Sequence, residues 1–265
     1  KPHLVKSSDM IIFQIISYIK FIINSYNGKA IKSVFLNNII DKVFKSETPA
    51  DTRQIFKAIR KSLTVNHQII QVTDYGQGSK LFRGNHRKVA KIAMVAGIGR
   101  KRGELLIRLI QYFKPENILE LGTSVGMGTA CLSLGNSQSN ITSLEGCPET
   151  AGVANNLFKE FGLTNIKVVV GPFEDTLNQV LDSQHYDFIY FDGNHSKDAT
   201  LDYFTQCLFT LTEKSVWLFD DIHWSKDMEA AWEIIKAHKQ VTSTIDTYRW
   251  GLVFFKPTEC WGDNN

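Results

Sequence analysis

The sequence predicts an α/β fold in which five parallel strands are closed by an antiparallel hairpin and preceded by a helical region. From residue 104 onward, short apolar runs alternate with helical patterns, as in a βαβ series. Two later strand-like runs, 244–247 and 250–255, are separated only by Tyr248 and Arg249, which permits only an antiparallel hairpin. A length of 265 residues, with 43% hydrophobic and 22% charged residues, indicates a globular protein and excludes disorder, collagen and coiled coil.

The elements of the sheet region follow one another in a regular order. The expected strands are 118–121, 141–144, 166–170, 188–191 and 216–219. The expected helices are 105–113, 127–134, 149–161, 174–181, 197–210 and 226–239. Since helical spacing dominates before this series, we expect a helical cap or oligomerisation region over 1–103 and a sheet domain over 104–265.

The first predicted helix, over 10–23, is apolar except for a narrow stripe of Gln14, Ser17, Lys20 and Asn24. It is shorter than the roughly 20 residues that span a bilayer, so no transmembrane segment is expected. No small-residue cleavage site follows it, which disfavours a signal peptide. Its apolar remainder must be covered, either inside the fold or in a homodimer interface, with a membrane surface as the alternative.

Three further segments complete the N-terminal region. Residues 31–44 have the apolar spacing of an amphipathic helix. Thr48 and Pro49 have the residue types of an N-cap and a first helical position, so they predict the start of a helix that runs through Leu63. Residues 69–73 have a short β-like pattern.

The net charge of +3 hides an uneven distribution. Between Asp74 and Glu104 there is no acidic residue, so this stretch has a charge of +8 and the rest of the chain −5. Its basic residues are Lys80, Arg83, Arg87, Lys88, Lys91, Arg100, Lys101 and Arg102. We interpret the stretch as part of a cap that recognises an anionic group, with nucleic-acid phosphates or a solvated helix face as alternatives. Residues 74–80 form a candidate lid.

The four cysteines, Cys131, Cys147, Cys207 and Cys260, have no C-x-x-C spacing. They therefore indicate neither a zinc site nor a redox motif. So few cysteines in a chain of this length do not form a disulfide framework, which favours a reducing compartment and a cytoplasmic location.

A glycine loop follows the first strand of the predicted sheet, with Gly122, Ser124 and Gly126 in G-x-S-x-G spacing. A dinucleotide fingerprint would need a third-position glycine, where Ser124 stands. The residues match the nucleophile-elbow motif of hydrolases, but a hydrolase usually places that motif after several strands, and here it follows the first one. A nucleoside site fits better, because Glu145 ends the second strand 25 residues after Glu120, where an acid accepts hydrogen bonds from ribose hydroxyls.

Taken together, residues 119–126, Glu145 and the terminal hairpin resemble the class I S-adenosylmethionine-dependent methyltransferases, over about 104–256. The resemblance implies a Rossmann-like methyltransferase sheet with S-adenosylmethionine bound at its carboxyl edge. It implies that the methionine end lies at the glycine loop, the ribose at Glu145 and the adenine near Phe173. The cofactor-binding residues would be Glu120, Gly122, Thr123, Ser124, Gly126, Glu145, Gly146, Phe173 and Asp192.

Acidic residues also end the fourth and fifth strands, as Asp192 and the pair Asp220-Asp221. Three unpaired carboxylates crowded together repel, and Mg²⁺ would relieve that repulsion, so they are candidate metal ligands. Acids at strand ends that cap helices or face solvent are the alternative. The pattern resembles metal-dependent O-methyltransferases of the catechol and antibiotic-sugar types. That resemblance implies His195 as a catalytic base beside Asp192, with His223 as a candidate outer-shell residue.

These features together predict an S-adenosylmethionine-dependent O-methyltransferase acting on a small hydroxylated acceptor, with an anionic group on the acceptor and Mg²⁺ assistance as expected refinements. The segment Asp192-Gly193-Asn194-His195 lacks the Asn/Asp-Pro-Pro-aromatic motif of enzymes that methylate base amines, which favours an oxygen acceptor. The alternatives are an RNA methyltransferase that uses the basic cap, a non-catalytic nucleoside-binding protein, and a hydrolase with Ser124 as nucleophile.

Overall fold

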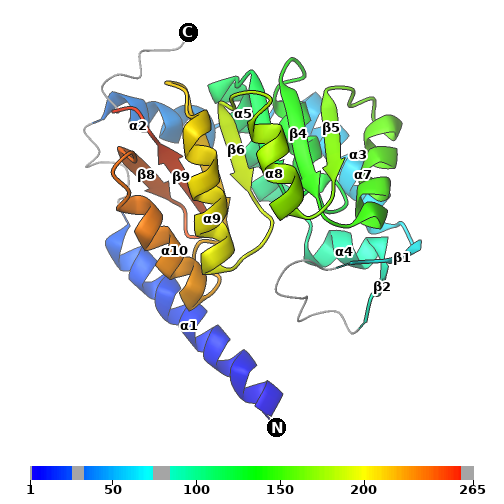
Figure 1. Cartoon of the computed structure of the whole chain (residues 1–265), viewed down its shortest axis with the longest axis horizontal. Helices are drawn as coiled ribbons and strands as arrows, with labels where there is room; N and C mark the ends of the chain where they lie inside the picture. The colour runs from blue at the N-terminus through cyan, green and yellow to red at the C-terminus, as the bar shows by residue number, and fades with distance from the viewer. Residues whose placement is uncertain (1, 26–32, 74–83, 258–265) are drawn as a thin grey trace.

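The computed structural model describes residues 2–25, 33–73 and 84–257 of the chain. Its centre is a seven-stranded sheet with the strand order β5-β4-β3-β6-β7-β9-β8 (Figure 1). The strands are β3 Asn117–Leu121, β4 Asn140–Glu145, β5 Ile166–Val170, β6 Phe188–Phe191, β7 Val216–Asp220, β8 Ser243–Asp246 and β9 Trp250–Phe254. The first five are parallel, and β9 pairs antiparallel with both β7 and β8. The predicted parallel sheet with a terminal hairpin is therefore confirmed.

Helices cover both faces of this sheet, which explains why its central strands are mostly apolar. One face carries α5 Arg100–Phe113, α6 Met127–Gly135 and α7 Pro148–Glu160. The other face carries α8 Phe173–Leu181, α9 Lys197–Cys207 with the 3₁₀ turn η2 Leu208–Thr210, and α10 Lys226–Lys236. Strands β6, β7 and β9 are buried at every position. Because these five strands are parallel, the loops that follow them meet at one edge of the sheet.

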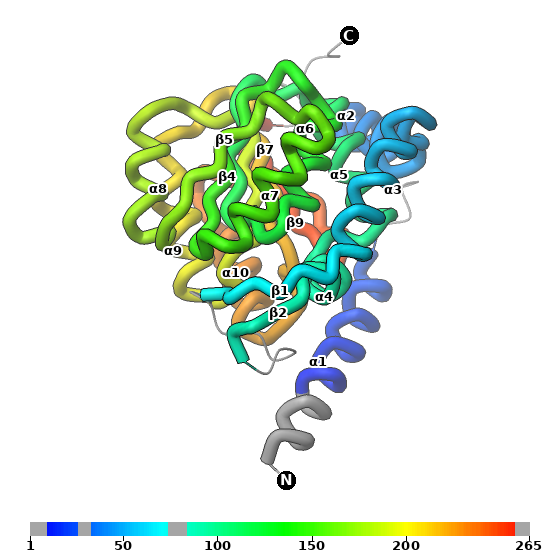
Figure 2. Tube along the Cα trace, turned by 90° about the vertical axis from the view of Figure 1, so that its right-hand side faces the viewer, coloured from blue at the N-terminus to red at the C-terminus, as the bar shows by residue number. Residues whose placement is uncertain are grey.

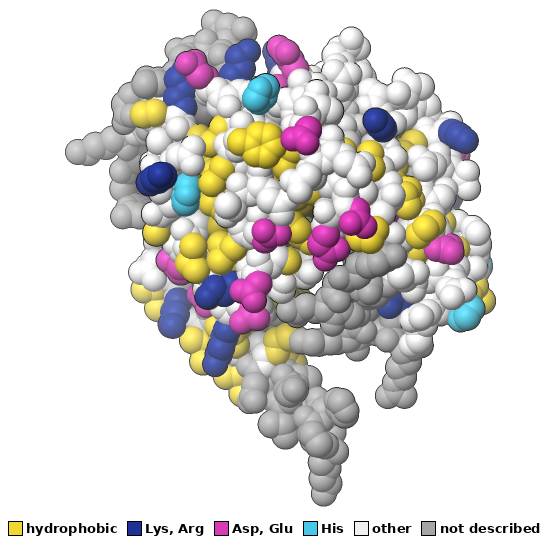
Figure 3. All heavy atoms as spheres, in the orientation of Figure 1, with side chains coloured by type: hydrophobic (Ala, Val, Ile, Leu, Met, Phe, Trp, Pro, Cys, Tyr) yellow, Lys and Arg dark blue, Asp and Glu magenta, His cyan; other side chains and the backbone are white. Residues whose placement is uncertain are grey.

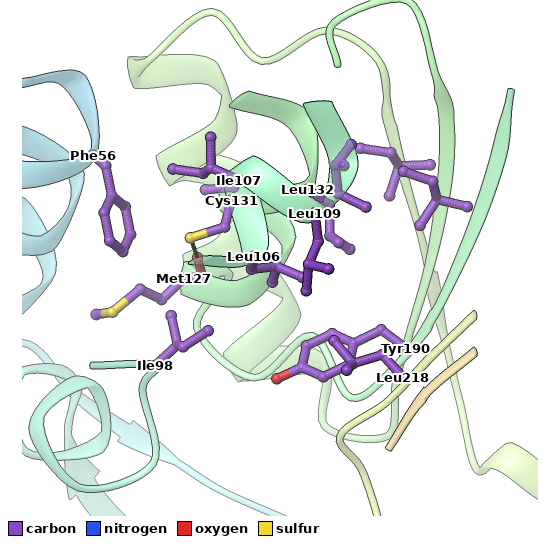
Figure 4. Packing of buried hydrophobic residues seen from close by; sticks show 14 of the residues in the cluster. Phe56, Ile98, Leu106, Ile107, Leu109, Met127, Cys131, Leu132, Tyr190 and Leu218 are labelled. Carbon is purple, nitrogen blue, oxygen red and sulfur yellow. Dashed lines mark hydrogen bonds between the residues drawn. The ribbon is translucent and has the colours of Figure 1, made fainter. Parts of the chain in front are cut away.

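The N-terminal helices belong to the same core as the sheet. They are α2 Val34–Ile39, which continues as the π-helical η1 Ile40–Phe44, then α3 Ala50–Thr64 and α4 Val89–Val95. Phe56 of α3 packs against α5 at Gly103, where an added Cβ would lie 2.2 Å from the ring (Figure 4). Arg60 of α3 donates a hydrogen bond to the Ile98 carbonyl just before α5. The expected division between residues 103 and 104 falls inside α5, and it remains a proposal about domain organisation.

Several local predictions differ from the structure. Thr48 is not an N-cap, because its Oγ1 donates to the Glu104 carbonyl and accepts from Arg108, so Pro49 takes the capping position of α3. The strand expected over 69–73 is β1 Ile69–Gln71, and it pairs antiparallel with β2 His86–Lys88, a hairpin that the sequence patterns do not reveal. The candidate lid over 74–80, with Lys80 and Arg83, lies outside the described residues.

Helix α1, Pro2–Asn24, packs against the body through the side that carries Gln14, Ser17 and Phe21 rather than through its isoleucines. Gln14 Nε2 donates to the Trp224 carbonyl, and the buried Ser17 hydroxyl lies 3.3 Å from His223 Nδ1. The isoleucines of the helix are exposed by contrast, and the helix projects from the body (Figure 2). Of the helices in the described ranges, none is long and apolar enough to cross a membrane. Of the three alternatives, packing inside the fold does not cover these isoleucines in the described part of the chain.

Candidate active site

The glycine loop between β3 and α6 passes close to the loop that follows β6. Gly122 has a φ of 113°, and an added Cβ there would lie 2.4 Å from the Asp192 carbonyl oxygen. Gly126 has a φ of 86°, and a Cβ there would meet the Phe158 ring at 2.8 Å. Both glycines are required, since a side chain would be strained and would collide. The loop therefore packs closely against the Asp192 backbone on one side and the Phe158 ring on the other.

Glu145 at the end of β4 is bonded to this loop. Its Oε2 accepts a hydrogen bond from the Ser124 backbone N–H at 2.6 Å. Its Oε1 accepts from the Cys147 N–H at 2.9 Å and from the Thr150 hydroxyl at 3.0 Å. Gly146 follows and is partly exposed. The carboxylate thus lies at the mouth of the glycine loop, at the position where the sequence predicts a ribose-binding acid.

Two other predicted cofactor residues have buried side chains. Glu120 is completely buried, and its Oε2 accepts hydrogen bonds from Thr129 and Ser143. Thr123 shares this network, because its Oγ1 is bonded to the Ser143 hydroxyl. Burial raises the pKa of Glu120 to about 7. Glu120 therefore joins β3 to β4 and α6, and its contact with a cofactor remains a prediction.

Phe173, the predicted adenine neighbour, is the first residue of α8. Its ring packs edge-on against Tyr203 of α9 with 5.7 Å between centroids. An added Cβ at Gly193 would lie 2.5 Å from the Phe173 ring, so the ring closes one side of the loop after β6. An aromatic ring at this edge suits stacking or edge contacts with a base, although no observation tests the adenine assignment.

The three predicted metal ligands do converge, at the ends of β6 and β7. Asp220 is almost fully buried, and its Oδ2 accepts hydrogen bonds from Arg102 and from the Tyr190 hydroxyl. Its Oδ1 accepts from the Asp221 backbone N–H at 2.6 Å. Burial and the nearby Asp220 raise the pKa of Asp192 well above its usual range, and the same two causes raise the pKa of Asp221. The carboxyl groups therefore repel one another, as the sequence predicts.

Basic side chains of the protein balance these acids. Arg102 forms an ion pair with Asp220, and its guanidinium carbon lies 5.1 Å from the centre of the Trp250 ring. Burial alone would lower the pKa of Arg102, but Asp220 and the neighbouring acids raise it above its ordinary value. Arg249 Nη1 lies 3.4 Å from Asp221 Oδ1. Each of these two acids has an arginine as its partner.

The predicted magnesium site is not assembled by these residues. Within 2–25, 33–73 and 84–257, no group of three or more His, Cys, Asp or Glu side chains could hold a metal ion. The physical reason is that both oxygens of Asp220 already accept hydrogen bonds and its charge is paired with Arg102. The sequence singles out Arg102 only as one of eight basic residues, because nothing local indicates a partner 118 residues away.

The two candidate histidines, His195 and His223, lie in different surroundings. His195 is one-third exposed, and its Nε2 lies 3.9 Å from Asp192 Oδ1. It lines a small pocket with Asn194 and Asp220 at the ends of β6 and β7. His223 instead bonds Asp246 Oδ2 at 2.8 Å and faces α1, so it does not support the acids. The placement of His195 permits the predicted base, and the assignment remains a prediction.

The described part of the basic stretch is not one helical cap. It runs through β2, α4 and the first turn of α5. The β1–β2 hairpin lies near the cofactor half of the edge, since the Thr73 N–H contacts the Cys147 sulfur at 3.4 Å. Arg102, at the start of α5, reaches the acids at the end of β7. The stretch therefore borders both halves of the candidate site.

Comparisons with known proteins agree with this geometry. Residues 119–222 match the family described as a methyltransferase domain. A methyltransferase, PaMTH1 of Podospora anserina, solved with S-adenosylhomocysteine, has a TM-score of 0.57 at 15% identity, covering 85% of this chain and 97% of that one. An O-methyltransferase of Bacillus cereus with the same ligand has a TM-score of 0.56 at 18% identity, covering 84% and 98%.

A third similar structure is the O-methyltransferase TomG of Streptomyces achromogenes, involved in tomaymycin synthesis and solved with S-adenosylmethionine. It has a TM-score of 0.53 at 19% identity, covering 61% of this chain and 82% of that one. No curated protein matches the sequence significantly. Residues 119–222 therefore match a methyltransferase domain, and the chain shares the α/β fold of these solved methyltransferases.

Proposed function

We propose that this chain transfers the methyl group of S-adenosylmethionine to a hydroxyl oxygen of a small acceptor. The observation that carries the proposal is the glycine loop of β3, bonded through the Ser124 N–H to Glu145 at the end of the neighbouring strand. The tight glycine turn at Gly122 and Gly126 suits the methionine end of the cofactor, and the Glu145 carboxylate suits two ribose hydroxyls. When bound, S-adenosylmethionine supplies an activated methyl group on a sulfonium sulfur.

The residues after β6 supply the proton chemistry in this proposal. His195 removes the proton of the acceptor hydroxyl as that oxygen attacks the methyl carbon, and the carbon–sulfur bond breaks as the carbon–oxygen bond forms. The proton ends on the imidazole, whose positive charge Asp192 stabilises from 3.9 Å. Holding the oxygen in line with the methyl group provides most of the acceleration.

An acceptor with an anionic group fits the surroundings of the site. Arg102 keeps 31% of its side chain exposed after pairing with Asp220, and Arg249 keeps 50% exposed beside Asp221. A carboxylate or phosphate on the acceptor can bind such guanidinium groups through two parallel hydrogen bonds. We therefore place a small hydroxylated anion first among acceptors.

The test is a screen of hydroxylated acceptors with S-adenosylmethionine, read by mass spectrometry. One added methyl group on an acceptor oxygen supports the proposal. Replacement of His195 by Ala should then lower kcat by about a hundredfold, since general-base removal costs this much, while KM for the cofactor stays unchanged. Hydrolysis of an ester that is lost in Ser124→Ala, with no methyl transfer, would contradict the proposal.

We also propose that a second copy of the chain covers the isoleucine face of α1, which comprises Ile11, Ile12, Ile15, Ile16, Ile19, Ile22 and Ile23. These side chains are 48% to 74% exposed and form an apolar stripe along the helix (Figure 3). Apolar patches beyond a few hundred Å² are rare on monomers. Such a stripe can pair with itself about a two-fold axis. Lys20 is the one charged residue from 10 to 24, which is little basic charge for binding an anionic membrane.

Analytical ultracentrifugation tests this interface. The wild type should sediment as a dimer, and the double variant Ile15→Asp/Ile19→Asp as a monomer. Ile55→Asp on α3 is the matched control, because Ile55 is similarly exposed but lies outside the stripe. A wild type that is monomeric and floats with lipid vesicles would contradict the dimer and favour binding of α1 to a membrane surface.

We also propose that the protein is located in the cytoplasm. Cys131, Cys147 and Cys207 are free thiols in the structure, and all three are buried. Free thiols support a reducing compartment.

A further inference from the structure

The acids at the ends of β6 and β7 have a set of cations that belongs to the protein itself. Arg102 pairs with Asp220, Arg249 Nη1 lies 3.4 Å from Asp221, and His195 Nε2 lies 3.9 Å from Asp192. A cluster of three acids without partners would attract a divalent cation to relieve its repulsion. This cluster instead has a basic side chain for each acid.

Arg102 is held in a fixed position by two different contacts. On one edge its guanidinium bonds Asp220, which also accepts from the Tyr190 hydroxyl and the Asp221 N–H. On its face it stacks over the Trp250 ring, with 5.1 Å from the guanidinium carbon to the ring centre. A guanidinium stays protonated at any physiological pH, so its charge is as permanent as that of a metal ion.

Asp220 is the residue on which a metal site at this edge would depend, because it lies at the centre of the cluster. Its side chain is only 3% exposed, and its Oδ2 already accepts hydrogen bonds from Arg102 and Tyr190. Binding a divalent cation there would require Asp220 to lose its arginine and its tyrosine hydroxyl. Breaking a buried charge pair in this way is strongly unfavourable.

We propose that Arg102 is a built-in replacement for the divalent cation, so that the site works without metal and Arg102 binds an oxygen of the acceptor. Its Nε has no hydrogen-bond partner among the described residues, and its one bonded Nη leaves further N–H groups at the partly exposed end. The part that concerns the acceptor rests on the proposed function. The claim that Arg102 excludes a metal ion depends only on the residues of this chain and not on the proposed function.

Removal of Arg102 should reveal the site that it suppresses. Arg102→Ala leaves Asp220 unpaired beside Asp192 and Asp221, so three carboxylates face one vacated volume. Because a unit positive charge is removed at contact distance, the affinity of this cluster for Mn²⁺ should rise at least about tenfold. Asp220→Asn in the Arg102→Ala background should abolish the gain.

The experiment measures Mn²⁺ binding by electron paramagnetic resonance and by calorimetry, with no acceptor present. We expect no stoichiometric Mn²⁺ binding to the wild type, a new single site in Arg102→Ala, and none in Arg102→Lys, which keeps the charge. Arg100→Ala is the matched control, since Arg100 lies in the same turn of α5 and is 64% exposed. Circular dichroism and S-adenosylhomocysteine binding check that each variant is folded.

Stoichiometric Mn²⁺ binding to the wild type, removed by Asp220→Asn, would overturn the proposal, and so would an Arg102→Ala variant that folds without gaining a site. Should Arg102→Ala fail to fold, the wild-type titration still decides the metal claim. Methyl transfer that is unchanged by a chelator supports it further. Failure of the whole screen for methyl acceptors would count against the proposed function and leave the Mn²⁺ result in force.

Discussion

The two halves of the carboxyl edge neutralise their acids in different ways. In the half at β3 and β4, Glu145 is bonded to two backbone N–H groups and a threonine hydroxyl, all within 26 residues of it. In the half at β6 and β7, Asp220 is bonded to Arg102, which comes from the helix before the sheet. The first half is a cradle of backbone and hydroxyl hydrogen-bond donors, suited to a neutral ribose. The second half is a set of charge pairs, suited to a charged or ionising acceptor.

Glu120 shows what happens to an acid that has neither arrangement. It accepts hydrogen bonds from Thr129 and Ser143 on one oxygen, while its other oxygen has no partner in the described part of the chain. Burial raises the pKa of Glu120 to about 7.

The largest effect is expected at the point where the two halves touch. Gly122→Ala places a Cβ 2.4 Å from the Asp192 carbonyl and forces a non-glycine residue to a φ of 113°. We expect a loss of about 3 kcal/mol or more in the free energy of unfolding, together with loss of cofactor binding. Chemical denaturation measures the first quantity and calorimetry the second.

Gly152→Ala in α7 is the control for that variant, because no atom lies within 4 Å of the Cβ that it adds. Alanine at a helical position should leave stability unchanged or raise it by up to about 1 kcal/mol. Equal behaviour of the two alanine variants would break the argument that the halves meet at Gly122.

The next largest effect is expected at Glu120, whose pKa is raised by burial. The unfolded chain loses the Glu120 proton near its ordinary pKa of 4.5, whereas the folded chain keeps it up to about 7. The folded state therefore binds more protons between these values, and the free energy of unfolding falls as the pH rises through them, by up to about 3 kcal/mol. Glu120→Gln should remove this loss and be more stable than the wild type at pH 8.

Denaturation curves at pH 5 and pH 8 check this prediction. Glu116→Gln is the control, since the Glu116 side chain is exposed and the pH dependence of that variant should equal that of the wild type. An unchanged pH dependence in Glu120→Gln would mean that the folded protein supports the ionised carboxylate by other means.

The smallest effect is expected at Glu145, in the half of the edge that we assign to the cofactor. Glu145→Gln keeps the shape of the side chain but weakens its acceptance of hydrogen bonds from ribose hydroxyls. The affinity for S-adenosylhomocysteine should fall about tenfold, since a hydrogen bond to a charged group contributes about 1.5–3 kcal/mol. Glu149→Gln, on the next turn and exposed, should bind as the wild type does. Similar losses in both variants would indicate a general charge effect.

The features that could be predicted from the sequence depend on neighbours along the chain. The apolar runs of the strands, the glycine loop and Glu145 follow from local patterns, and parallel topology then brings Asp192 and Asp220 to one edge. The pairing of Arg102 with Asp220 depends on how α5 packs against the sheet, which no local pattern reports. The side of α1 that faces the body carries Gln14, Ser17 and Phe21, because Trp224, His223 and Tyr248 provide partners there. The isoleucines of the helix stay exposed, which is opposite to the usual rule for an amphipathic helix.

The most direct test of the central claim is a calorimetric titration of S-adenosylhomocysteine into the wild type in the presence of a chelator. The account predicts binding of one ligand per chain, with an affinity that is unchanged when Mg²⁺ replaces the chelator and is lost in Glu145→Ala. The absence of binding under both conditions, or equal binding by Glu145→Ala, would contradict it.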